Sequence, residues 1–331
     1  MQKQYTIASF FTGVGGLDKG FENTGAFTTK YSNEIDPFPA QVFEENFKLP
    51  VDTRSIVDIK PEEIPNFDIC IGGFPCQAFS IAGYRQGFED EKGRGNMFFE
   101  LARIIKAKTP NAIILENVKN LTTHDNGKTF AIILDTLKAL GYHTKYQVLN
   151  TMTHGNLPQN RERIYIVGFR DTTACENFTF PSPTPLTTTL HDIIDFNSRI
   201  DEKYYYTPGK FKGNIYEKLT EAMDDENAVY QWRRGYVRKN KSGAIPTLTA
   251  NQGTGGHNVC IVKTKHGIRK MTPRECFNAQ GFDSNYILPD GMADSRLYKQ
   301  AGNSVSVPVV ERFAEKVADA LDSADKAPQS I

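Results

Sequence analysis

Short β-type runs alternate with longer amphipathic segments through the first half of the chain, and this alternation constrains the fold more than any other feature. It predicts an α/β protein with a doubly wound, mainly parallel sheet. Ligands of such sheets bind outside the carboxyl ends of the strands, so the residues directly after each strand are the candidate site residues. Strands are expected at 6–11, 28–33, 68–73, 112–115, 146–150 and 164–169, and helices at 37–46, 97–106 and 128–140.

The second half of the chain differs from the first in composition and in the regularity of its apolar pattern. A Pro/Thr-rich stretch at 180–189 is typical of an exit linker. The following residues, up to about 262, are irregular and rich in Gly, Tyr and basic residues, which indicates a smaller domain of short strands and loops. An ordered pattern resumes near Lys270 and ends in an amphipathic helix over 307–321. We therefore expect a first domain over 1–175, a second domain over 176–267 and a return to the first domain over 268–331.

Charge, apolar runs and cysteine content limit the functional classes to which the protein can belong. Lys+Arg and Asp+Glu both number 39, so a nucleic-acid-binding surface must arise from local clustering of charge. The apolar runs are shorter than the roughly 20 residues of a membrane span, and the first residues lack the features of a signal peptide. Scattered cysteines without a CxxC pair argue against a disulfide framework or a zinc site and favour a reducing cytoplasm. They are Cys70, Cys76, Cys175, Cys260 and Cys276.

A glycine-rich turn, FTGVGG at 11–16, follows the first expected strand. Its glycines allow the backbone to approach a ligand closely. Glu34 ends the second expected strand, where a carboxylate binds ribose hydroxyls in dinucleotide-type folds; the alternative is an ordinary surface carboxylate. The turn is not a full G-x-G-x-x-G run and has no Walker lysine. It therefore favours an adenosine ligand without phosphates over NAD or ATP.

Three further segments place reactive side chains at strand ends. Cys76, in GGFPCQAFS, follows a strand, where electropositive neighbours would favour its thiolate, although a lone cysteine is more often structural. Glu116 ends another strand, where partial desolvation lets a carboxyl group hold or donate a proton near neutrality. Arg161 and Arg163 lead into the strand at 164–169. Alternation predicts that both point from one face into the crevice, the alternative being a solvated strand edge.

These segments resemble, in order and spacing, the motifs of the bacterial DNA (cytosine-5) methyltransferases of restriction–modification systems. FTGVGG is similar to the family's cofactor loop, GGFPCQAFS to its PCQ nucleophile loop, ENV at 116–118 to its acid motif and QNRERIY at 159–165 to its arginine motif. Near the other end, REC at 274–276 with QGF at 280–282 resembles the RE…GFP segment, with Asp283 in place of proline. YKQAGNSV at 298–305 resembles the final GNSV motif. The resemblance covers about 1–175 and 268–325.

The resemblance implies S-adenosylmethionine as cofactor, S-adenosylhomocysteine as product and no metal. Where the family has an aspartate that accepts from the adenine amino group, this chain has Ser55, and a hydroxyl accepts more weakly; Asp58 is the other candidate. The implied cofactor-binding residues are Phe11, Gly13, Gly15, Gly16, Glu34, Ser55, Ile56, Pro75, Met97, Asn303 and Ser304.

The resemblance also implies a mechanism. The Cys76 thiolate adds to carbon 6 of a cytosine rotated out of the duplex, and Glu116 binds and protonates its N3. Arg163, together with Arg161, binds the O2 of the base and offsets developing charge. Carbon 5 then takes the methyl group, and β-elimination releases Cys76.

The segment 176–267 is implied to be the target-recognition domain. Its stretch at 231–241 interleaves basic and aromatic residues, which suits phosphate and base-edge contacts, although a charge run is otherwise typical of a solvated face. The Thr-Leu pair at 247–248 resembles the start of the family's second recognition loop. Expected phosphate contacts are Lys263, Lys265, Arg269 and Lys270. Expected DNA contacts are Gln77, Ser80 and Arg85 after the nucleophile, and Gln231, Arg233, Arg234, Arg238, Thr247, Asn251 and Gln252.

Other functions remain open from the sequence. A tRNA cytosine-5 methyltransferase uses the same scaffold, and a non-catalytic DNA-binding relative would keep the fold. A Rossmann-type dehydrogenase is disfavoured because the phosphate-binding turn is absent. The expected partner is double-stranded DNA, with no membrane, a cognate restriction endonuclease as a genetic rather than physical partner, and action as a monomer. The expected location is the bacterial cytoplasm, at the nucleoid through DNA.

Overall fold

The computed structural model describes residues 4–75, 97–211, 214–233, 235–241, 243–252 and 258–326. The chain divides into two compact units: unit 1 is Met1–Leu149, Glu162–Ser182 and Val309–Ile331, and unit 2 is Asn150–Arg161 and Pro183–Pro308. These units differ from the domain boundaries expected from the sequence, because 268–308 belongs to unit 2 and only the last segment returns to unit 1.

Unit 1 is built on a six-stranded sheet in the order β2-β1-β3-β4-β7-β5. Strand β1 pairs in parallel with β2 and β3, and β3 pairs in parallel with β4, whereas β7 runs antiparallel to β4. The expectation of a doubly wound, mainly parallel α/β sheet is confirmed. The strands are β1 (Tyr5–Phe10), β2 (Phe27–Asn33), β3 (Ile69–Gly72), β4 (Ala112–Val118), β5 (His143–Asn150) and β7 (Glu162–Phe169).

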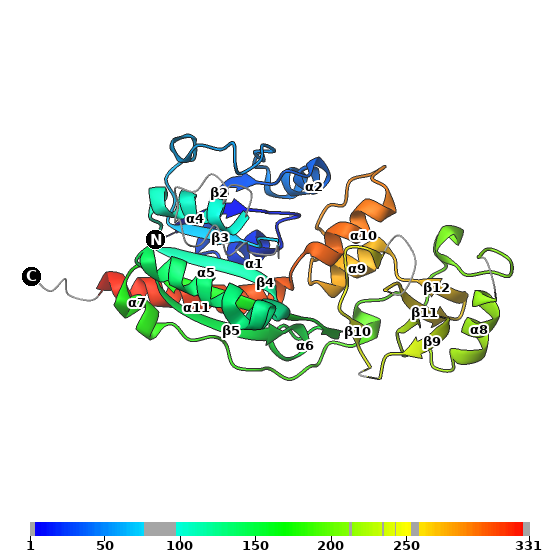
Figure 1. Ribbon diagram of the computed structural model, residues 1–331. Helices are drawn as coiled ribbons and strands as arrows, with labels where there is room; N and C mark the ends of the chain where they lie inside the picture. The colour runs from blue at the N-terminus through cyan, green and yellow to red at the C-terminus, as the bar shows by residue number, and fades with distance from the viewer. Residues whose placement is uncertain are drawn as a thin grey trace, which may run out of the picture. The chain divides into compact units, whose positions relative to one another are not determined.

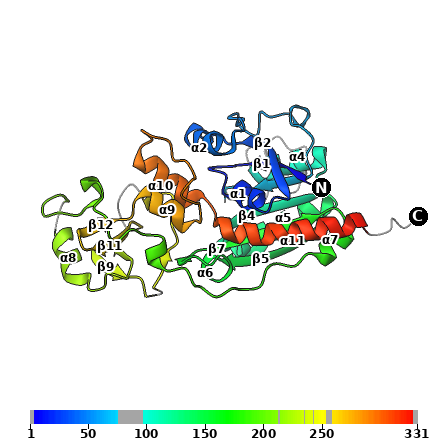
Figure 2. The same ribbon diagram turned by 180° about the vertical axis from the view of Figure 1, so that it is seen from behind.

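Helices cover both faces of this sheet (Figures 1 and 2). On the face of α4 and α5, the fully buried Leu101 and Ile133 pack in one core with Ile113 and Leu115 of β4. On the other face, Phe313 of α11 contacts Phe21 of α1 and Tyr165 of β7, at ring-centroid distances of 5.8 and 4.9 Å. The helices are α1 (Gly16–Asn23), α2 (Pro37–Phe47), α4 (Met97–Lys108), α5 (Lys128–Ala139), α7 (Thr172–Asn177) and α11 (Val307–Lys326).

Local sequence explains where several of these helices begin and end. Asp36 caps α2 by accepting the backbone N–H of Phe38, and Pro37 occupies the first turn, where its missing N–H costs nothing. Lys48 closes the same helix in the left-handed conformation, with its N–H on Glu44 O. Short 3-10 turns lie at Pro61–Glu63, Lys119–Thr122, His124–Gly127, Leu190–Asp192 and Glu202–Tyr204.

Unit 2 contains a four-stranded antiparallel sheet in the order β12-β11-β8-β9. Leu219 of α8 packs on this sheet against Tyr230, Ile261 and Ile268. A parallel pair, β6 with β10, lies apart from that sheet. The remaining elements are α6 (Thr151–His154), β6 (Gln159–Asn160), α8 (Ile215–Ala222), β8 (Tyr230–Arg233), β9 (Tyr236–Lys239), β10 (Ile245–Pro246), β11 (Cys260–Thr264), β12 (Gly267–Lys270), α9 (Pro273–Ala279) and α10 (Asp294–Asn303).

The structure extends several predicted elements. The expected strand at 112–115 continues to Val118, because antiparallel pairing with β7 carries it through polar residues that end the apolar run. Glu116 therefore lies inside β4 rather than after it. Strand β5 begins at His143, and α11 continues to Lys326. Over the described ranges, the chain contains no helix of the length and apolarity that a membrane crossing requires.

Candidate active site

Strand register brings the predicted site segments of unit 1 to one edge of the sheet. The strand order reverses at β1, which pairs with β2 on one side and β3 on the other, and this is where ligands bind in doubly wound folds. Phe10 pairs with Gly72, Gly72 with Leu115, and Glu116 with Tyr165. The residues that follow β1 and β3, the end of β4 and the start of β7 therefore share this edge.

The glycine turn after β1 is held against the end of β2. The backbone N–H of Gly13 donates to Glu34 Oε2 over 2.9 Å, and the N–H of Asp36 donates to Glu34 Oε1. Gly13 has φ +56 with no atom within 4 Å of an added Cβ, so it leaves open space beside the carboxylate. Gly15 has φ +73, and a Cβ there would overlap the rings of Phe43 and Phe47. The Glu34 carboxylate is thus fixed by two backbone amides beside this open space.

The segment with Ser55 and Ile56 is held beside the same turn. Asn33, at the end of β2, donates its amide to the carbonyls of Asp52 and Arg54, over 2.7 and 2.9 Å. Arg103 of α4 donates to Ile56 O over 2.9 Å. Ser55 is partly buried and Ile56 is buried. The structure thereby brings these two predicted cofactor residues near Glu34, which is hydrogen-bonded to Asp52 as well.

Glu116 and Arg163 form an ion pair on the strand pair β4–β7. Arg163 Nε lies 3.1 Å from Glu116 Oε1, and the two side chains are 15% and 11% exposed. Because Arg163 pairs with Val118, two residues along from Glu116, both side chains lie on one face of the sheet. Glu116 also lies next to β3, since a Cβ on Gly73 would be 3.2 Å from its Oε2.

Asn117 ties the acid motif to the nucleophile loop. Its side-chain amide donates to Phe74 O over 2.8 Å, and its Oδ1 accepts the N–H of Val118. Pro75 is exposed and Met97 begins α4. Cys76 lies outside the described residues. The described cysteines, Cys70, Cys175, Cys260 and Cys276, are all buried, and burial raises the pKa of each thiol. None of these four has the features of a nucleophile.

The structure places the Arg161 side chain elsewhere than the sequence analysis predicted. It precedes β7 and is 2% exposed, with its guanidinium on the backbone carbonyls of Leu248, Gly302 and Ser304, all in unit 2. The expectation that Arg161 and Arg163 point together into one crevice is wrong. The alternation argument requires both residues in one strand, and β7 begins only at Glu162.

The expected DNA contacts of unit 2 are only partly on its surface. Arg238 and Asn251 are exposed and Arg233 is partly buried, but Gln231 and Gln252 are buried, at 5% and 3% exposed. Thr247 donates its hydroxyl to Asn160 O over 2.6 Å. The structure therefore does not present the amides of Gln231 and Gln252 for base reading. Gln77, Ser80, Arg85 and Arg234 lie outside the described residues.

Two expected phosphate contacts are corrected. Arg269 is fully buried and forms an ion pair with Glu275 over 2.7 Å, so it has no face toward solvent. Lys270 is partly buried with its ammonium 5.3 Å from the Tyr298 ring centroid, and desolvation lowers its pKa. Lys263 donates to Met223 O, whereas Lys265 is exposed. Lys263, Arg269 and Lys270 therefore make contacts within unit 2. Of the four expected phosphate contacts, Lys265 is the one that lies fully on the surface of the unit.

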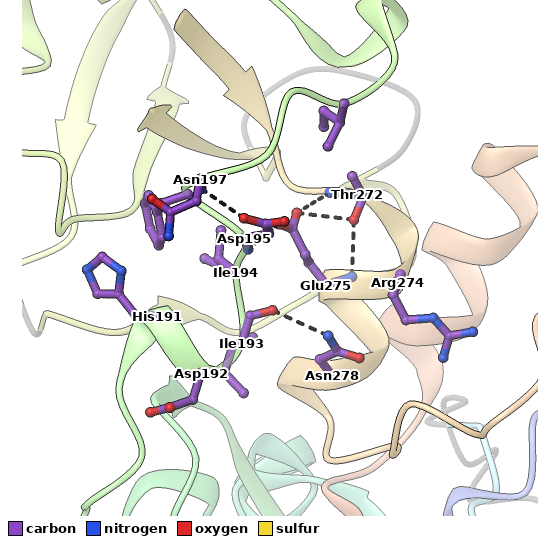
Figure 3. A pocket seen from close by; sticks show the side chains of 12 residues that line it. His191, Asp192, Ile193, Ile194, Asp195, Asn197, Thr272, Arg274, Glu275 and Asn278 are labelled. Atoms are coloured by element: carbon purple, nitrogen blue, oxygen red, sulfur yellow. Dashed lines mark hydrogen bonds between the residues drawn. The ribbon is translucent and has the colours of Figure 1, made fainter. Parts of the chain in front are cut away.

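A cavity of about 400 Å³ in unit 2 is lined by Arg274 and Glu275 of the RE segment, together with residues of 191–200 (Figure 3). Its carboxylates already have partners: Glu275 binds Arg269 and Thr272, and Asp195 accepts the N–H groups of Asn197 and Ser198. Hydrogen bonds from Ser198 and Asn197 lower the pKa of Asp195 to about 2. Because these carboxylates bind groups of the protein itself, we interpret the cavity as a structural feature at the start of α9. Over the described ranges no cluster of His, Cys, Asp and Glu side chains suits a metal ion.

Sequence reasoning missed two supports of the site. Asp18 is fully buried and accepts from Ser9 of β1 and Thr29 of β2, over 2.9 and 3.1 Å, beside the glycine turn. Its partners come from two different strands, so no spacing in the sequence signals the contact. Asn117 was present in the ENV motif, but its link to Phe74 depends on the pairing of β3 with β4.

The doubly wound sheet is that of a Rossmann-like methyltransferase, and its edge holds the glycine turn beside Glu34 and the ion pair of Glu116 with Arg163. The family model described as C-5 cytosine-specific DNA methylase matches residues 5–319, and the chain belongs to this family. It is therefore a DNA (cytosine-5) methyltransferase with S-adenosylmethionine as methyl donor. The tRNA methyltransferase and the non-catalytic relative are not favoured.

Similar proteins agree with this assignment. The chain is 57% identical to the Type II methyltransferase M.Bsp6I of Bacillus sp. (strain RFL6), over 94% of this chain and 98% of that protein. It is 40% identical to M.SsoII of Shigella sonnei, over 97% and 82%. Among solved structures, the Dnmt2 methyltransferase of S. pombe has a TM-score of 0.73 at 14% identity, covering 96% of this chain and 100% of that one. A DNMT2 variant of Spodoptera frugiperda has a TM-score of 0.71 at 20% identity, covering 95% and 99%. These two likenesses show the fold alone.

Proposed function

We propose that this enzyme methylates carbon 5 of a flipped cytosine in a short specific duplex sequence, through a covalent bond from Cys76 to carbon 6, as the modification enzyme of a restriction–modification system. The observation that carries the catalytic part is the Glu116–Arg163 pair beside Gly73, three residues before Cys76 in the chain. The names of the Type II relatives support the biological role.

Carbon 5 of cytosine is a poor nucleophile, so the base must be activated before it can take a methyl group. The Cys76 thiolate forms a bond to carbon 6, and Glu116 delivers a proton to N3, which gives an enamine with electron density on carbon 5. Methyl transfer consumes this electron density. Loss of the carbon 5 proton to water, β-elimination of the thiolate and return of the N3 proton to the Glu116 carboxylate then restore the neutral aromatic base and the Cys76 thiolate.

Arg163 has a double role in this scheme. Its Nε holds the Glu116 carboxyl group, and its Nη1 donates to Glu162 O over 2.8 Å, which fixes the plane of the guanidinium. A fixed guanidinium beside the acid can donate to the O2 of the base and offset the charge that develops during addition. Arg161 is not assigned to the base in this scheme, because its guanidinium binds three backbone carbonyls.

S-Adenosylmethionine supplies an electrophilic methyl group on a sulfonium sulfur. The site fits its adenosine part, because two backbone amides hold the Glu34 carboxylate in place and Gly13 leaves open space beside it. Glu34 would bind the ribose hydroxyls and Ser55 and Ile56 the adenine. The proposal keeps the remaining family-implied contacts, which are Phe11, Gly15, Gly16, Pro75, Met97, Asn303 and Ser304.

The proposal for DNA recognition assigns target reading to about 176–267. Arg233, Arg238, Thr247 and Asn251 are the candidates among the described residues, and Gln77, Ser80, Arg85 and Arg234 remain candidates from the sequence. We further propose that the enzyme acts as a monomer in the bacterial cytoplasm and meets DNA at the nucleoid. A cognate restriction endonuclease would be a genetic rather than a physical partner.

The deciding experiment is base-resolution methylation sequencing of unmethylated plasmid DNA after incubation with the enzyme and S-adenosylmethionine. We expect methylcytosine confined to one short motif. Cys76→Ser should leave no methylcytosine, because a hydroxyl is far less nucleophilic than a thiolate, yet should keep DNA binding within a few-fold in a gel-shift assay. Methylation by Cys76→Ser at the wild-type rate would refute the nucleophile assignment. Untouched DNA with folded, cofactor-bound wild-type enzyme would refute the proposed substrate.

A further inference from the structure

A buried polar cluster in unit 2, formed by Gln159, Arg161 and Gln280, joins segments that are far apart in the sequence. Their side chains are buried, with Gln159 and Gln280 at 0% and Arg161 at 2% exposed. We call these three residues the Arg161 cluster. Polar side chains are buried in this way only where hydrogen bonds offset the loss of hydration, so their partners show what the cluster holds.

The cluster holds both backbone groups of Leu248. Arg161 Nη1 donates to Leu248 O over 2.9 Å, and Gln159 Oε1 accepts the N–H of Leu248 over 3.3 Å. Next to it, Thr247 donates its hydroxyl to Asn160 O, and β10 pairs with β6 at 159–160. The start of the loop at 247–252 is therefore fixed to the segment that leads into Arg163.

The same arginine holds the GNSV turn. Its Nη2 donates to Gly302 O over 3.1 Å and to Ser304 O. Gln280 supports that end by donating to Ala301 O over 2.7 Å, and it accepts from Gln159 over 3.2 Å. A Cβ at Gly302 would overlap the backbone of Thr249 and Ala250, so the turn and the loop are in direct contact.

The guanidinium geometry suits this role. Arginine presents its N–H groups as a planar fork, so one side chain fixes carbonyls on two separate segments at defined angles. A lysine ammonium offers its protons from a single point and cannot span Leu248 O and Gly302 O in the same way. The planar fork of arginine therefore suits position 161, where two separate segments have to be held.

We propose that Arg161 is a positioning residue that sets the start of the loop at 247–252, and through it the discrimination between target sequences, without contacting the cytosine. This inference rests on the proposed assignment of target reading to that domain. The loop carries Thr247 and Asn251, both candidate DNA contacts, and Arg161 anchors it two residues before Arg163 in the chain. A displaced anchor therefore changes target recognition while Glu116 and Arg163 keep their ion pair.

The test compares sequence discrimination rather than activity alone. Unmethylated genomic DNA is treated with wild-type enzyme or Arg161→Lys, and methylation rates at target sites and at sites differing by one base are read by base-resolution sequencing. We expect the ratio of the two kcat/KM values to fall at least tenfold in Arg161→Lys, with a raised KM for DNA and a smaller change in kcat. If the ratio stays within twofold of wild type and activity falls only with the folded fraction, Arg161 is merely structural and the proposal is overturned.

A matched control separates positioning from stability. Arg269 is also a fully buried arginine of unit 2, but it is held by Glu275 and Asp195 O rather than by the loop. Arg269→Lys should lower thermal stability and leave the discrimination ratio unchanged; an equal fall of the ratio in this variant would also overturn the proposal. Gln159→Met, which removes the acceptor of the Leu248 N–H, serves if Arg161→Lys does not fold, and we expect a fall of at least threefold. Wild-type enzyme that methylates no motif would mark a failure of the proposed function, not of this inference.

Discussion

Asp18 shows how a single buried carboxyl group is placed beside the glycine turn at 11–16. It lies in the first turn of α1, fully buried, and accepts from the hydroxyls of Ser9 and Thr29, while Thr12 of the turn donates to Ser9. Burial raises the pKa of Asp18 to about 7 against the two hydroxyl hydrogen bonds, which lower it. The network ties the turn to β1 and β2 through one side chain.

This raised pKa predicts a pH dependence of stability. The folded protein holds the Asp18 proton more tightly than the unfolded chain, where the pKa is near 4. The stabilising contribution is complete below about pH 4 and is lost as pH rises through about 7. Between pH 5 and pH 8 the free energy of unfolding of wild type should fall by about 3 kcal/mol relative to Asp18→Asn, which is uncharged throughout. Urea denaturation at several pH values measures both curves, and parallel curves would contradict the prediction.

At the scale of elements, the close packing of α1 against α11 joins the two ends of the chain. Gly20 of α1 lies so near α11 that an added Cβ would be 2.5 Å from Val310 Cβ. The aromatic contacts of Phe313 with Phe21 and Tyr165 continue this interface. The sequence of α11 is amphipathic, but only the glycine permits the distance at which its buried face reaches α1.

Substitution of Gly20 tests this interface. In an exposed helix interior, Gly→Ala stabilises by about 0.5–1 kcal/mol. Here Gly20→Ala should instead destabilise by about 1–3 kcal/mol, because the new methyl group overpacks against Val310. Asp135→Ala, at an exposed position of α5, is the control and should change the free energy of unfolding by less than about 0.5 kcal/mol. A gain in urea stability for Gly20→Ala would show that the helices are farther apart.

The antiparallel strand β7 brings together the proposed catalytic pair. Glu116 and Arg163 are far apart in the sequence and meet only because Val118 pairs with Arg163 in the β4–β7 register. A register shift by one residue would send Arg163 to the opposite face and leave Glu116 without its ion pair.

At the scale of the whole molecule, the chain has no net charge to attract DNA, since 39 basic residues balance 39 acidic ones. Several basic side chains of unit 2 are engaged within the protein: Arg269 with Glu275, and Lys239 with Asp224 and Asp225. Affinity for the phosphate backbone must therefore come from local groups such as Arg238 and Lys265, which are exposed.

Local phosphate contacts still make DNA binding strongly dependent on salt. Each contact contributes about 0.9 to the slope of log affinity against log salt, so several contacts should weaken binding about a hundredfold between 50 and 200 mM salt. Fluorescence anisotropy with a labelled duplex measures this change. Binding of S-adenosylmethionine, followed by calorimetry over the same range, is the control and should change less than about threefold. A DNA affinity that is insensitive to salt would contradict a phosphate-based interface.

Much of unit 1 was predictable because its signals are local. Each strand is a short apolar run, and motif residues follow strand ends, so the sequence alone could assign Gly13, Glu34, Pro75 and Glu116 to one edge of the sheet. The position and the hydrogen-bond partners of Arg161 could not be predicted in this way. Its partners Leu248, Gly302 and Ser304 are distant in the sequence, and alternation gave it the wrong direction because β7 begins one residue later.

The sequence by itself determined the α/β class, the family and the order of the motifs, because hydrophobic period and short-range spacing are written directly along the chain. Only the tertiary structure decided that Glu116 pairs with Arg163, that Asp18 supports the glycine turn, and that Arg161 and Arg269 are buried inside unit 2. Those outcomes depend on strand register and on burial. A buried charged side chain needs a carbonyl or carboxylate to offset its lost hydration, and that partner can be distant in the sequence.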